Sequence, residues 1–436
     1  MCGFIVGKGL KQNLNNIIED IHYRGIPGYK GYSRYHDVQL AHYSLPIVNL
    51  NKDFAIQPVY SESRIPSVFA GEIFNYKELG RFETDSLCIT DKYHEVGLDS
   101  FHWFDGFWSF ATVSLGNIVA VTDYLAQKPV YYRTDVDVVA SEIDILRQFG
   151  PCTPDKLFLS NVAKWGYDPR PNTPWEEIKQ IPPGHYYYNG KIHKYWDWKK
   201  VPKKDLKTDL KEAVKLRMGG QRDVAILLSG GLDSSIIHGL LKELEINPLT
   251  IHVDNSEENY AKLVNPNLTT VSLDNISDEE ALKVHQTPVD LGSVKPQIAM
   301  AKKLEELDFN VVMTGDGADE LFGGYRRAKE YDSQHSDVFC ELPYYHCPKL
   351  DRTMMRYTVE LRTPYLAPSI VSHALDIPYE KRKGIKEVLK ETFGYLVPQV
   401  ILDRDKLPLK TKEIHSDPIK KRMDNLKLWK EINELA

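Results

Sequence analysis

The run Val224–Leu228, Val-Ala-Ile-Leu-Leu, is followed directly by Ser229-Gly230-Gly231-Leu232-Asp233-Ser234-Ser235 and then by a helical pattern. Five apolar residues in a row, ended by a glycine loop, indicate a buried strand. The glycines let backbone N–H groups approach an anion, the serines add hydroxyl donors, and the helix N-terminus adds partial positive charge. A glycine turn with a serine N-cap would share parts of this pattern, but the order of strand, loop and helix favours a phosphate-binding loop. We predict that the loop residues Ser229, Gly230, Gly231, Asp233 and Ser234 bind a nucleotide.

The last residues of this loop indicate which phosphate chemistry it serves. A Walker A loop ends in Gly-Lys-Ser/Thr and serves transfer of the terminal phosphate, but this loop contains no lysine. It resembles the pyrophosphatase loop of enzymes that split ATP into AMP and pyrophosphate. A carboxylate such as Asp233 would repel bare phosphate, so we expect it to hold Mg²⁺. The cofactors implied by the loop are therefore ATP and Mg²⁺.

On both sides of the loop, apolar runs alternate with helical patterns. We expect strands at 224–228, 249–253, 269–273 and 309–313, and helices at 235–244, 298–307 and 319–331. Ser277 with Glu280 forms a capping box that opens another helix. Strands alternating with helices indicate an α/β fold with a parallel sheet. Ligands of such sheets bind beyond the carboxyl ends of the strands, which puts Val253 beside the adenine. Leu227, near the end of the strand before the glycine loop, is also expected to bind ATP.

A second motif follows the strand that ends at Met313. The chain continues as Thr314-Gly315-Asp316-Gly317-Ala318-Asp319-Glu320-Leu321-Phe322-Gly323-Gly324-Tyr325, with three acids within five positions. A helix N-terminus capped by Asp316 would explain one acid, because acids there offset the helix dipole. The whole segment strongly resembles the signature of the asparagine synthetase family, usually written S-G-[ED]-G-x-D-E-x-F-G-G-Y, with Thr314 in the serine position.

This resemblance implies roles for individual residues. Thr314 and Gly315 contact the nucleotide, Asp316 helps ammonia to attack, and Asp319 coordinates Mg²⁺ together with Asp233. The run Lys383–Phe393 is similar to the family's lysine segment and makes Lys386 the cation over the developing charge. The run Glu360–Leu366 matches E-x-R-x-P-[FY]-L, although Ala367 replaces the usual Asp.

The first part of the chain has a different pattern. Apolar runs at 2–7, 38–48, 67–74, 107–115, 118–122 and 138–143 alternate with turn signals, which indicates antiparallel strands. Hairpin turns are expected at Gly116-Asn117 and Asn189-Gly190, and helices near 10–22 and 85–96. The lysine-rich stretch 195–207 contains Pro202 and predicts a linker. We therefore expect two domains, residues 2–195 and 205–436.

Cys2 becomes the N-terminal residue once Met1 is removed. Its α-amino group, with an ordinary pKa of about 7.7 to 8.0, can then act as base for its own thiol. A lone cysteine near a chain start is more often without function, but class II glutamine amidotransferases begin with Cys-Gly or Cys-Ser and are fused to this synthetase domain. Residues 24–25, 45–58, 71–75 and 123–131 resemble that domain. The resemblance implies an α+β sandwich of antiparallel sheets, similar to N-terminal-nucleophile hydrolases, followed by an α/β ATP-pyrophosphatase domain.

The resemblance also implies a glutamine site. Gly71 and Glu72 should line it, and Asp85 should bind the glutamine α-amino group. Two positions depart from the family: Ala70 replaces the Asn that completes the oxyanion hole, and Ser44 replaces the Arg that pairs with the glutamine carboxylate. Losing one oxyanion donor costs about 10²–10³ in rate. We therefore expect glutamine hydrolysis that is slow or directed at a different amide donor.

Composition sets the limits of these hypotheses. A chain of 436 residues favours two or three domains, and a net charge of −6 argues against general nucleic-acid binding. No signal-peptide core and no run of about 18 uncharged apolar residues occur, so we expect a cytoplasmic protein. The five cysteines do not suggest a disulfide framework. A metal site at Cys340, His346 and Cys347 is disfavoured, because their spacing is wrong for a zinc knuckle.

The hypothesis is a glutamine-hydrolysing asparagine synthetase that adenylates a carboxylate with ATP and amidates it with ammonia released at Cys2. Aspartate is the default acceptor, although Val289–Ser293 is shorter than its usual counterpart and lacks the typical Thr and Arg. One alternative is a ligase that uses free ammonia or an intramolecular amine, as β-lactam synthetases do. Another is a non-catalytic module that keeps the fold. The expected partners are small-molecule substrates, with no nucleic acid and no membrane, and we consider a homodimer as the assembly.

Overall fold

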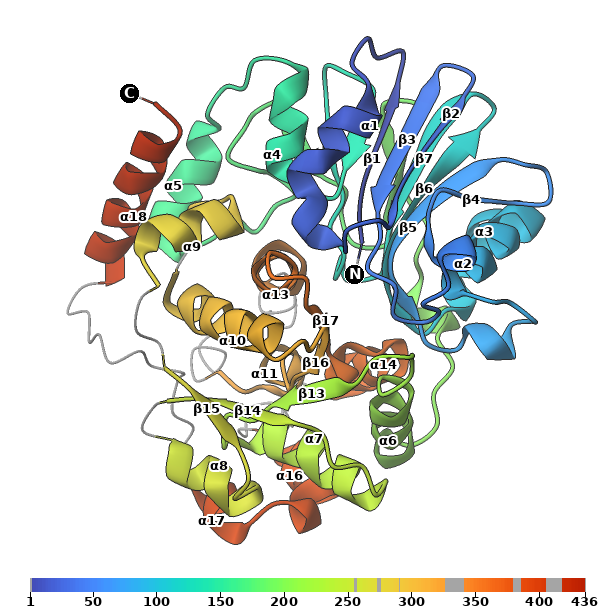
Figure 1. Cartoon of the computed structure of the whole chain (residues 1–436). Helices are drawn as coiled ribbons and strands as arrows, with labels where there is room; N and C mark the ends of the chain where they lie inside the picture. The colour runs from blue at the N-terminus through green and yellow to red at the C-terminus, as the bar shows by residue number, and fades with distance from the viewer. Residues whose placement is uncertain are drawn as a thin grey trace.

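The part of the chain before the linker is built on two antiparallel sheets (Figure 1). The computed structural model of the protein describes residues 2–254, 257–272, 276–289, 291–325, 341–378, 386–404 and 418–435. One six-stranded sheet has the order β10 (Ile178–Gln180), β8 (Tyr131–Arg133), β9 (Val138–Ala140), β1 (Gly3–Lys8), β3 (Val38–Tyr43), β2 (Lys30–Tyr35). The other has the order β12 (Lys191–Lys194), β11 (His185–Tyr188), β7 (Asn117–Thr122), β6 (Gly106–Ser114), β5 (Pro66–Ile73), β4 (Val59–Tyr60).

Alternation of side chains along the strands explains how these sheets are covered. In β1, Phe4 and Val6 point into the apolar layer between the sheets, whereas Ile5 points to the opposite face. Helices α1 (Leu14–Ile17) and α4 (Ile143–Leu146) and the 3₁₀ helix Ile18–Arg24 cover that face. Helix α3 (Asp85–Val96) covers the outer face of the second sheet. The result is a helix, sheet, sheet, helix sandwich, which confirms the α+β prediction.

The second half contains a five-stranded sheet with the order β15 (Thr269–Val271), β14 (Thr250–Val253), β13 (Val224–Leu227), β16 (Val311–Met313), β17 (Glu360–Arg362). All neighbouring strands are parallel. One face packs on α6 (Leu206–Leu216), α7 (Leu232–Glu243), α8 (Glu258–Val264), α14 (Pro368–Asp376) and α16 (Glu387–Phe393). Helices α10 (Val294–Glu306) and α13 (Cys347–Met355) cover the other face. The predicted α/β fold is confirmed.

Most predicted elements are present, but some end elsewhere. The strand expected at 38–48 ends at Tyr43, and the run 138–143 divides into β9 and the start of α4. Strands β2, β4, β8, β10 and β17 were not predicted. The helix expected at 319–331 is only α11 (Ala318–Phe322) in the described residues, because Gly323, with φ of 77°, ends it in a left-handed conformation. The hairpin turn at Asn189-Gly190 is confirmed, whereas the first turn lies one residue earlier than predicted, at Leu115-Gly116, because Ser114 pairs with Asn117. Ser277 caps α9 (Asp278–His285) by accepting from Glu280 N, but the Glu280 carboxylate meets Tyr357 and Lys302, so one half of the predicted capping box is present.

Buried ion pairs join the two halves. Asp351 of α13 pairs with Arg24 and, at 2.5 Å, with Lys128, both from the first half. Arg24 also pairs with Glu142 at 2.8 Å. The C-terminal helix α18 (Pro418–Ile432) reaches back across the division and lies against α5 (Lys156–Trp165) of the first half (Figure 1). The halves therefore share a polar interface, and the domain limits 2–195 and 205–436 remain our proposal.

Removing the Asp351 carboxylate should strongly destabilise the protein. Asp351→Ala would leave Lys128 and Arg24 buried without this counter-charge, at a cost of about 3–5 kcal/mol. Burial raises the pKa of Asp351, but Arg24 and Lys128 hold it below its ordinary value. The stabilisation that the Asp351 carboxylate gives to the folded protein is therefore fully present above the ordinary pKa and is lost as the pH falls through the lowered pKa. Urea denaturation followed by circular dichroism measures the effect. Glu95→Ala, at an exposed pair with Lys92, is the control. Equal midpoints for the two variants would contradict the prediction.

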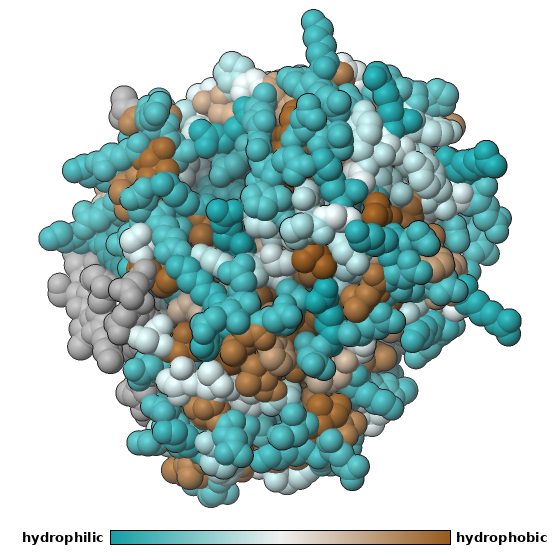
Figure 2. Space-filling model, in the orientation of Figure 1, coloured by the Kyte–Doolittle hydropathy of each residue, from teal (hydrophilic) through white to brown (hydrophobic). Residues whose placement is uncertain are grey.

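On the face shown in Figure 2, hydrophilic residues dominate and apolar residues form small separate patches. Such a surface is expected where the large apolar side chains are buried in cores. None of the helices in the described ranges is long and apolar enough to cross a membrane.

Candidate active sites

A cavity of about 740 Å³ lies at the carboxyl edge of the parallel sheet. Strands β13 and β16 are neighbours and run in the same direction, so the loop after β13 and the segment after β16 emerge side by side. Residues from both line the cavity, together with residues of α10, α13 and α16. This is the edge at which open parallel sheets bind ligands.

The glycine-serine loop is held by its own hydroxyl groups. Ser229 Oγ lies 3.0 Å from Ser234 Oγ and accepts from Gly231 N at 3.2 Å, and Ser235 Oγ donates to Gly231 O at 2.7 Å. Helix α7 begins at Leu232, directly after this turn. The loop therefore presents a helix N-terminus and a fixed turn to the cavity, the arrangement that favours phosphate.

The segment after β16 packs closely against this loop. A Cβ on Gly315 would lie 2.9 Å from Ser234 N and 3.0 Å from the carbonyl carbon of Asp233, so any larger residue would push the two motifs apart. Thr314 Oγ1 donates to Asp316 Oδ2 at 2.6 Å, which orients that carboxylate. Glycine at 315 therefore allows the two motifs to form one surface.

Lys386 reaches the same surface from the start of α16. Its Nζ pairs with both Asp233 and Asp319, and its side chain is only 3% exposed. Burial lowers the pKa of Lys386, but the two carboxylates raise it above its ordinary value, so the side chain is a cation. Lys386 has φ of 55°, a left-handed conformation that costs a non-glycine residue about 1 kcal/mol or more. Such strain is typical of functional positions.

The structure brings nearly all of the predicted nucleotide residues together. Leu227, Ser229, Gly231, Asp233, Ser234, Val253, Thr314, Gly315, Asp316, Asp319 and Lys386 all line the cavity. Gly230 does not belong to the wall. Its carbonyl accepts from Arg404 at 3.0 Å, so its contribution is to the shape of the loop. Asp290 and Lys383–Ile385, which belong to the predicted acceptor and lysine segments, lie outside the described residues, as does Cys340.

Cys2 lies in the other half, at the start of β1. It lines a narrow cavity of about 40 Å³ with Ser44, Gly71, Glu72 and Asp85, so the predicted glutamine-site residues are also brought together. Burial raises the pKa of the Cys2 thiol. Attack by the thiolate therefore needs a base close to the sulfur.

Asp85 is the first residue of α3 and is held at its position by backbone groups. Its Oδ2 accepts from Ile73 N at 3.1 Å and its Oδ1 from Ser86 N at 2.9 Å. Burial raises the pKa of Asp85 to about 7, although these hydrogen bonds oppose the shift. Gly71 has φ of 133°, and a Cβ there would lie 2.1 Å from Phe107 O, so only glycine fits between Ala70 and Glu72. The chain next to Cys2 is therefore rigidly placed.

The structure shows why Ser44 cannot replace an arginine. His42 Nε2 lies 2.9 Å from Phe69 O, and since a carbonyl only accepts, this nitrogen carries the hydrogen. His42 Nδ1 then accepts the hydroxyl hydrogen of Ser44 at 2.9 Å. Burial lowers the pKa of His42 to about 3, so its ring is neutral. Ser44 has no hydrogen left to donate to a carboxylate, and no Lys, Arg or His is among the described residues that line this cavity.

Arg362 connects the two sites, a role that the sequence did not indicate. Its backbone carbonyl accepts from Thr314 N at 3.0 Å. Its guanidinium pairs with Glu72 at 2.5 Å and Glu360 at 2.7 Å, and donates to the carbonyls of Arg217 and Gly219. The motif Glu360–Leu366 marked this segment, but the partner Glu72 lies in the other half and can be found only from the packing.

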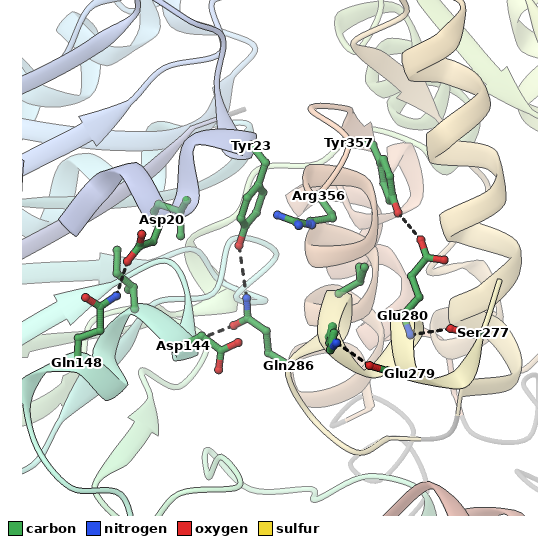
Figure 3. Close-up of a pocket in the computed structure, with 14 residues that line it drawn as sticks. Asp20, Tyr23, Asp144, Gln148, Ser277, Glu279, Glu280, Gln286, Arg356 and Tyr357 are labelled. Atoms are coloured by element: carbon green, nitrogen blue, oxygen red, sulfur yellow. Dashed lines mark hydrogen bonds and ion pairs between the residues drawn. The ribbon is translucent and has the colours of Figure 1, made fainter. Parts of the chain in front are cut away.

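A second large cavity, of about 650 Å³, lies between the halves (Figure 3). Tyr23 and Asp144 of the first half and Gln286 and Arg356 of the second face this space, and Arg356 lies over the Tyr23 ring at 4.4 Å. Neither Cys2 nor the glycine-serine loop lines it, so this cavity is separate from both predicted sites.

Both halves of this chain are similar to known proteins. The asparagine synthase family model matches residues 205–339 and 330–428, and the glutamine amidotransferase domain model matches residues 1–196. The chain is 24% identical over 465 residues to asparagine synthetase (glutamine-hydrolysing) 2 of Oryza sativa subsp. japonica, covering 93% of this chain and 74% of that protein. It is 26% identical over 442 residues to asparagine synthetase B (glutamine-hydrolysing) of Escherichia coli strain K12, covering 87% and 76%.

Among solved structures, a glutamine phosphoribosylpyrophosphate amidotransferase from B. subtilis aligns with 72% of this chain and 81% of that chain, with 10% identity and a TM-score of 0.34. The family matches carry the assignment, because the asparagine synthase model extends over more than half of the sequence. The chain belongs to the asparagine synthase family.

Proposed function

We propose that this protein is a glutamine-dependent asparagine synthetase. It adenylates the side-chain carboxylate of aspartate with ATP, releases pyrophosphate, and amidates the acyl-adenylate with ammonia freed from glutamine at Cys2. The observation that carries this proposal is the convergence of the glycine-serine loop, Asp316, Asp319 and Lys386 on one cavity. The names of the matching relatives support the same activity.

In the synthetase half, the groups that offset the negative charge of the phosphates would already be in position before the reaction begins. An aspartate carboxylate oxygen attacks the α-phosphorus of ATP, the bond to the β-phosphate bridge breaks, and pyrophosphate leaves. The loop N–H groups and Lys386 offset the charge on the phosphates. Ammonia then attacks the acyl carbon, AMP leaves with the bonding electron pair, and Asp316, oriented by Thr314, accepts the proton.

The same cavity has the donors that Mg²⁺ requires. Asp233 and Asp319 converge on the Lys386 ammonium, so both carboxylates can meet one cation. No three His, Cys, Asp or Glu side chains within the described ranges are grouped to hold a metal on their own. Mg²⁺ is commonly held by one or two carboxylates and completed by substrate phosphates, which fits this pair. Mg²⁺ bound there with ATP would neutralise negative charge on the pyrophosphate.

The glutaminase half would use Cys2 as nucleophile and its own α-amino group as base. The α-amino group takes the thiol proton, the Cys2 thiolate attacks the glutamine amide carbon, and that proton passes to the leaving nitrogen, which departs as ammonia and leaves a thioester. Water then attacks the thioester, which releases glutamate and restores the thiol. Ala70 supplies no side-chain donor for the oxyanion, which leaves backbone N–H groups of this segment for that purpose.

Glutamine should be a weaker nitrogen donor than ammonia in vitro. A charged hydrogen bond contributes about 1.5–3 kcal/mol, so the arginine missing at Ser44 should raise the glutamine requirement about ten- to a hundredfold. Ser44→Arg with Ala70→Asn should improve kcat/KM for glutamine without changing the ammonia reaction. Steady-state asparagine formation with each donor measures both. If the unmodified protein uses micromolar glutamine as readily as ammonia, other residues bind the glutamine carboxylate and stabilise the oxyanion. The roles expected at positions 44 and 70 would then be wrong.

Glutamine use should also depend on the ionisation of Asp85. Only the carboxylate form attracts the glutamine ammonium group, and burial puts the pKa of Asp85 at about 7. Deprotonation of Asp85 should therefore contribute a rise in kcat/KM for glutamine of about tenfold per pH unit below about pH 7, separate from the rise due to the Cys2 α-amino base, whose ordinary pKa is about 7.7 to 8.0. Asp85→Asn cannot ionise at this position, so it should lose this contribution to the rise in kcat/KM below about pH 7 and should also bind glutamine more weakly. A wild-type profile that is flat across about pH 6 to 8 would remove Asp85 from the proposed role.

The acceptor is best tested by ATP–pyrophosphate exchange with a panel of carboxylic acids. Aspartate should support exchange without any nitrogen donor, because adenylation precedes amidation. Exchange with another acid but not with aspartate would keep the reaction class and change the substrate.

A further inference from the structure

One wall of the glutamine cavity is held in place by the synthetase half of the chain. This wall consists of residues 44–49, all of which line the narrow cavity that contains Cys2. Burial raises the pKa of the Cys2 thiol, and a hydrogen bond from the Leu45 backbone opposes that rise, so the wall contacts the nucleophile itself. The position of the wall therefore bears directly on glutamine hydrolysis.

The two ends of this wall are held by different parts of the chain. At its start, Ser44 is bonded within the first half, since Ser44 N donates to Tyr29 O at 2.9 Å and Ser44 O accepts from Ile26 N at 3.0 Å. Further along, the side chains of Leu45 and Ile47 are buried in the same apolar cluster as residues of β13, α6 and α7. This part of the wall thus belongs to the first half by sequence and to the second half by packing.

The turn between α6 and β13 supplies the hydrogen bonds that hold the rest of the wall. Arg222 Nε donates to Pro46 O at 2.7 Å, and Gln221 N donates to Ile47 O at 2.7 Å. Gln221 Oε1 accepts from Leu50 N at 3.0 Å, directly after the wall. Backbone groups that leave water need such partners. Three backbone groups in and beside the wall therefore have their partners in the other half.

The turn is itself fixed on the parallel sheet. Arg222 Nη1 donates to Asn310 Oδ1 at 2.5 Å, and Asn310 O, directly before β16, accepts from Glu360 N at 2.7 Å. Arg222 therefore joins the wall to the starts of β16 and β17. Gly220 in the same turn lies so close to the wall that a Cβ there would be 3.0 Å from Ile47 Cγ2. The sheet, the turn and the wall thus form one continuous set of contacts.

We propose that this turn positions the glutamine site, with Arg222 as the main positioning residue for glutamine hydrolysis. Through Pro46, Arg222 sets where the wall lies, and with it the distance between the Leu45 N–H and the Cys2 sulfur. Arg222 is not among the described residues that line the cavity, so it acts through the wall and not on the substrate. The inference rests on the proposed function, in which Cys2 hydrolyses glutamine, and deepens it: a residue of the synthetase half completes the glutamine site.

Arg222→Met tests this inference, because it keeps a long side chain but removes the donors to Pro46 O and Asn310. We expect kcat/KM for glutamine to fall about ten- to a hundredfold, as for the loss of a charged hydrogen bond. Asparagine formation from ammonia and ATP–pyrophosphate exchange with aspartate should stay at the wild-type rate, because neither reaction uses the wall. Arg222→Lys, which keeps a charged donor, should recover part of the loss.

The reactivity of Cys2 gives a second readout, which separates positioning from a loss of folding. Alkylation by iodoacetamide, followed across pH by mass spectrometry of the N-terminal peptide, reports the pH at which the thiolate forms. In Arg222→Met this pH should rise, because the thiolate loses the hydrogen bond from Leu45. Unfolding would instead lower it, because burial is what raises the pKa of the Cys2 thiol.

Arg422→Met is the matched control. Arg422 Nη1 also donates to a backbone carbonyl of the other half, Lys164 O at 2.8 Å, but it does so where α18 lies against α5, and neither residue lines the glutamine or the nucleotide cavity. This variant should keep all three reactions and the alkylation profile of the wild type.

Wild-type use of glutamine by Arg222→Met, with an unshifted alkylation profile, would overturn the inference and leave the proposed function standing. If Arg222→Met does not fold, Gln221→Leu decides, because Gln221 is exposed and its side chain bonds only Leu50 N next to the wall. A fall in glutamine use alone would support the inference, and wild-type glutamine use would overturn it. If the wild type makes asparagine from ammonia but not from glutamine, the glutaminase part of the proposed function fails and this inference falls with it.

Discussion

Asp233→Asn is expected to lower AMP-forming turnover about 10²–10³-fold while leaving the fold intact. The substitution preserves the size of the side chain but removes one of two carboxylates that converge on Lys386 and would hold Mg²⁺. Asp233 is in the first turn of α7, at the edge of the cavity, and Asp319 remains as a counter-charge for the buried Lys386 ammonium, so the fold should stay intact. Aspartate-dependent release of pyrophosphate measures the effect, with Glu95→Gln as a surface control. Wild-type release by Asp233→Asn would refute the loop assignment.

Cys2→Ala should eliminate asparagine formation from glutamine and leave formation from ammonia at the wild-type rate. The thiol is the only nucleophile proposed for amide cleavage, whereas ammonia from solution can reach the acyl-adenylate directly. The side chain is buried and small, so its loss leaves little empty space.

Cys88→Ala is the matched control for this variant, since Cys88 is also buried in the first half but belongs to the core under α3. It should retain both reactions. Persistence of the glutamine reaction in Cys2→Ala, or loss of both reactions together, would show that the division into two sites is wrong.

The sequence predicted those parts of the structure that depend on residues close together along the chain. Val224–Leu228 and the following glycine-serine loop fold within one strand, turn and helix, so their pattern determines their structure. The position of Asp316 and Asp319 followed from the end of a neighbouring parallel strand, because all such ends meet at one edge. The gathering of these residues in one cavity could therefore be predicted.

Features that depend on packing between distant segments could not be predicted. The link from Arg362 to Glu72 joins residues in different halves, and the contact of His346 with Glu320, at 3.1 Å, joins segments far apart in the sequence. The sequence showed that Ser44 replaces an arginine, but only the neighbouring His42 shows that its hydroxyl hydrogen is already engaged. Gly323 was read as part of a helix, although its left-handed conformation ends α11.

The central claim is that the chain activates a carboxylate with ATP before nitrogen is added. The most direct test is the exchange of labelled pyrophosphate into ATP, with Mg²⁺ and aspartate present and with neither glutamine nor ammonia. We predict exchange that requires aspartate, that persists in Cys2→Ala and that is lost in Asp233→Asn. We also predict AMP rather than ADP as the product once ammonia is added. Exchange that does not require an acid, or ADP as the product, would contradict the central claim.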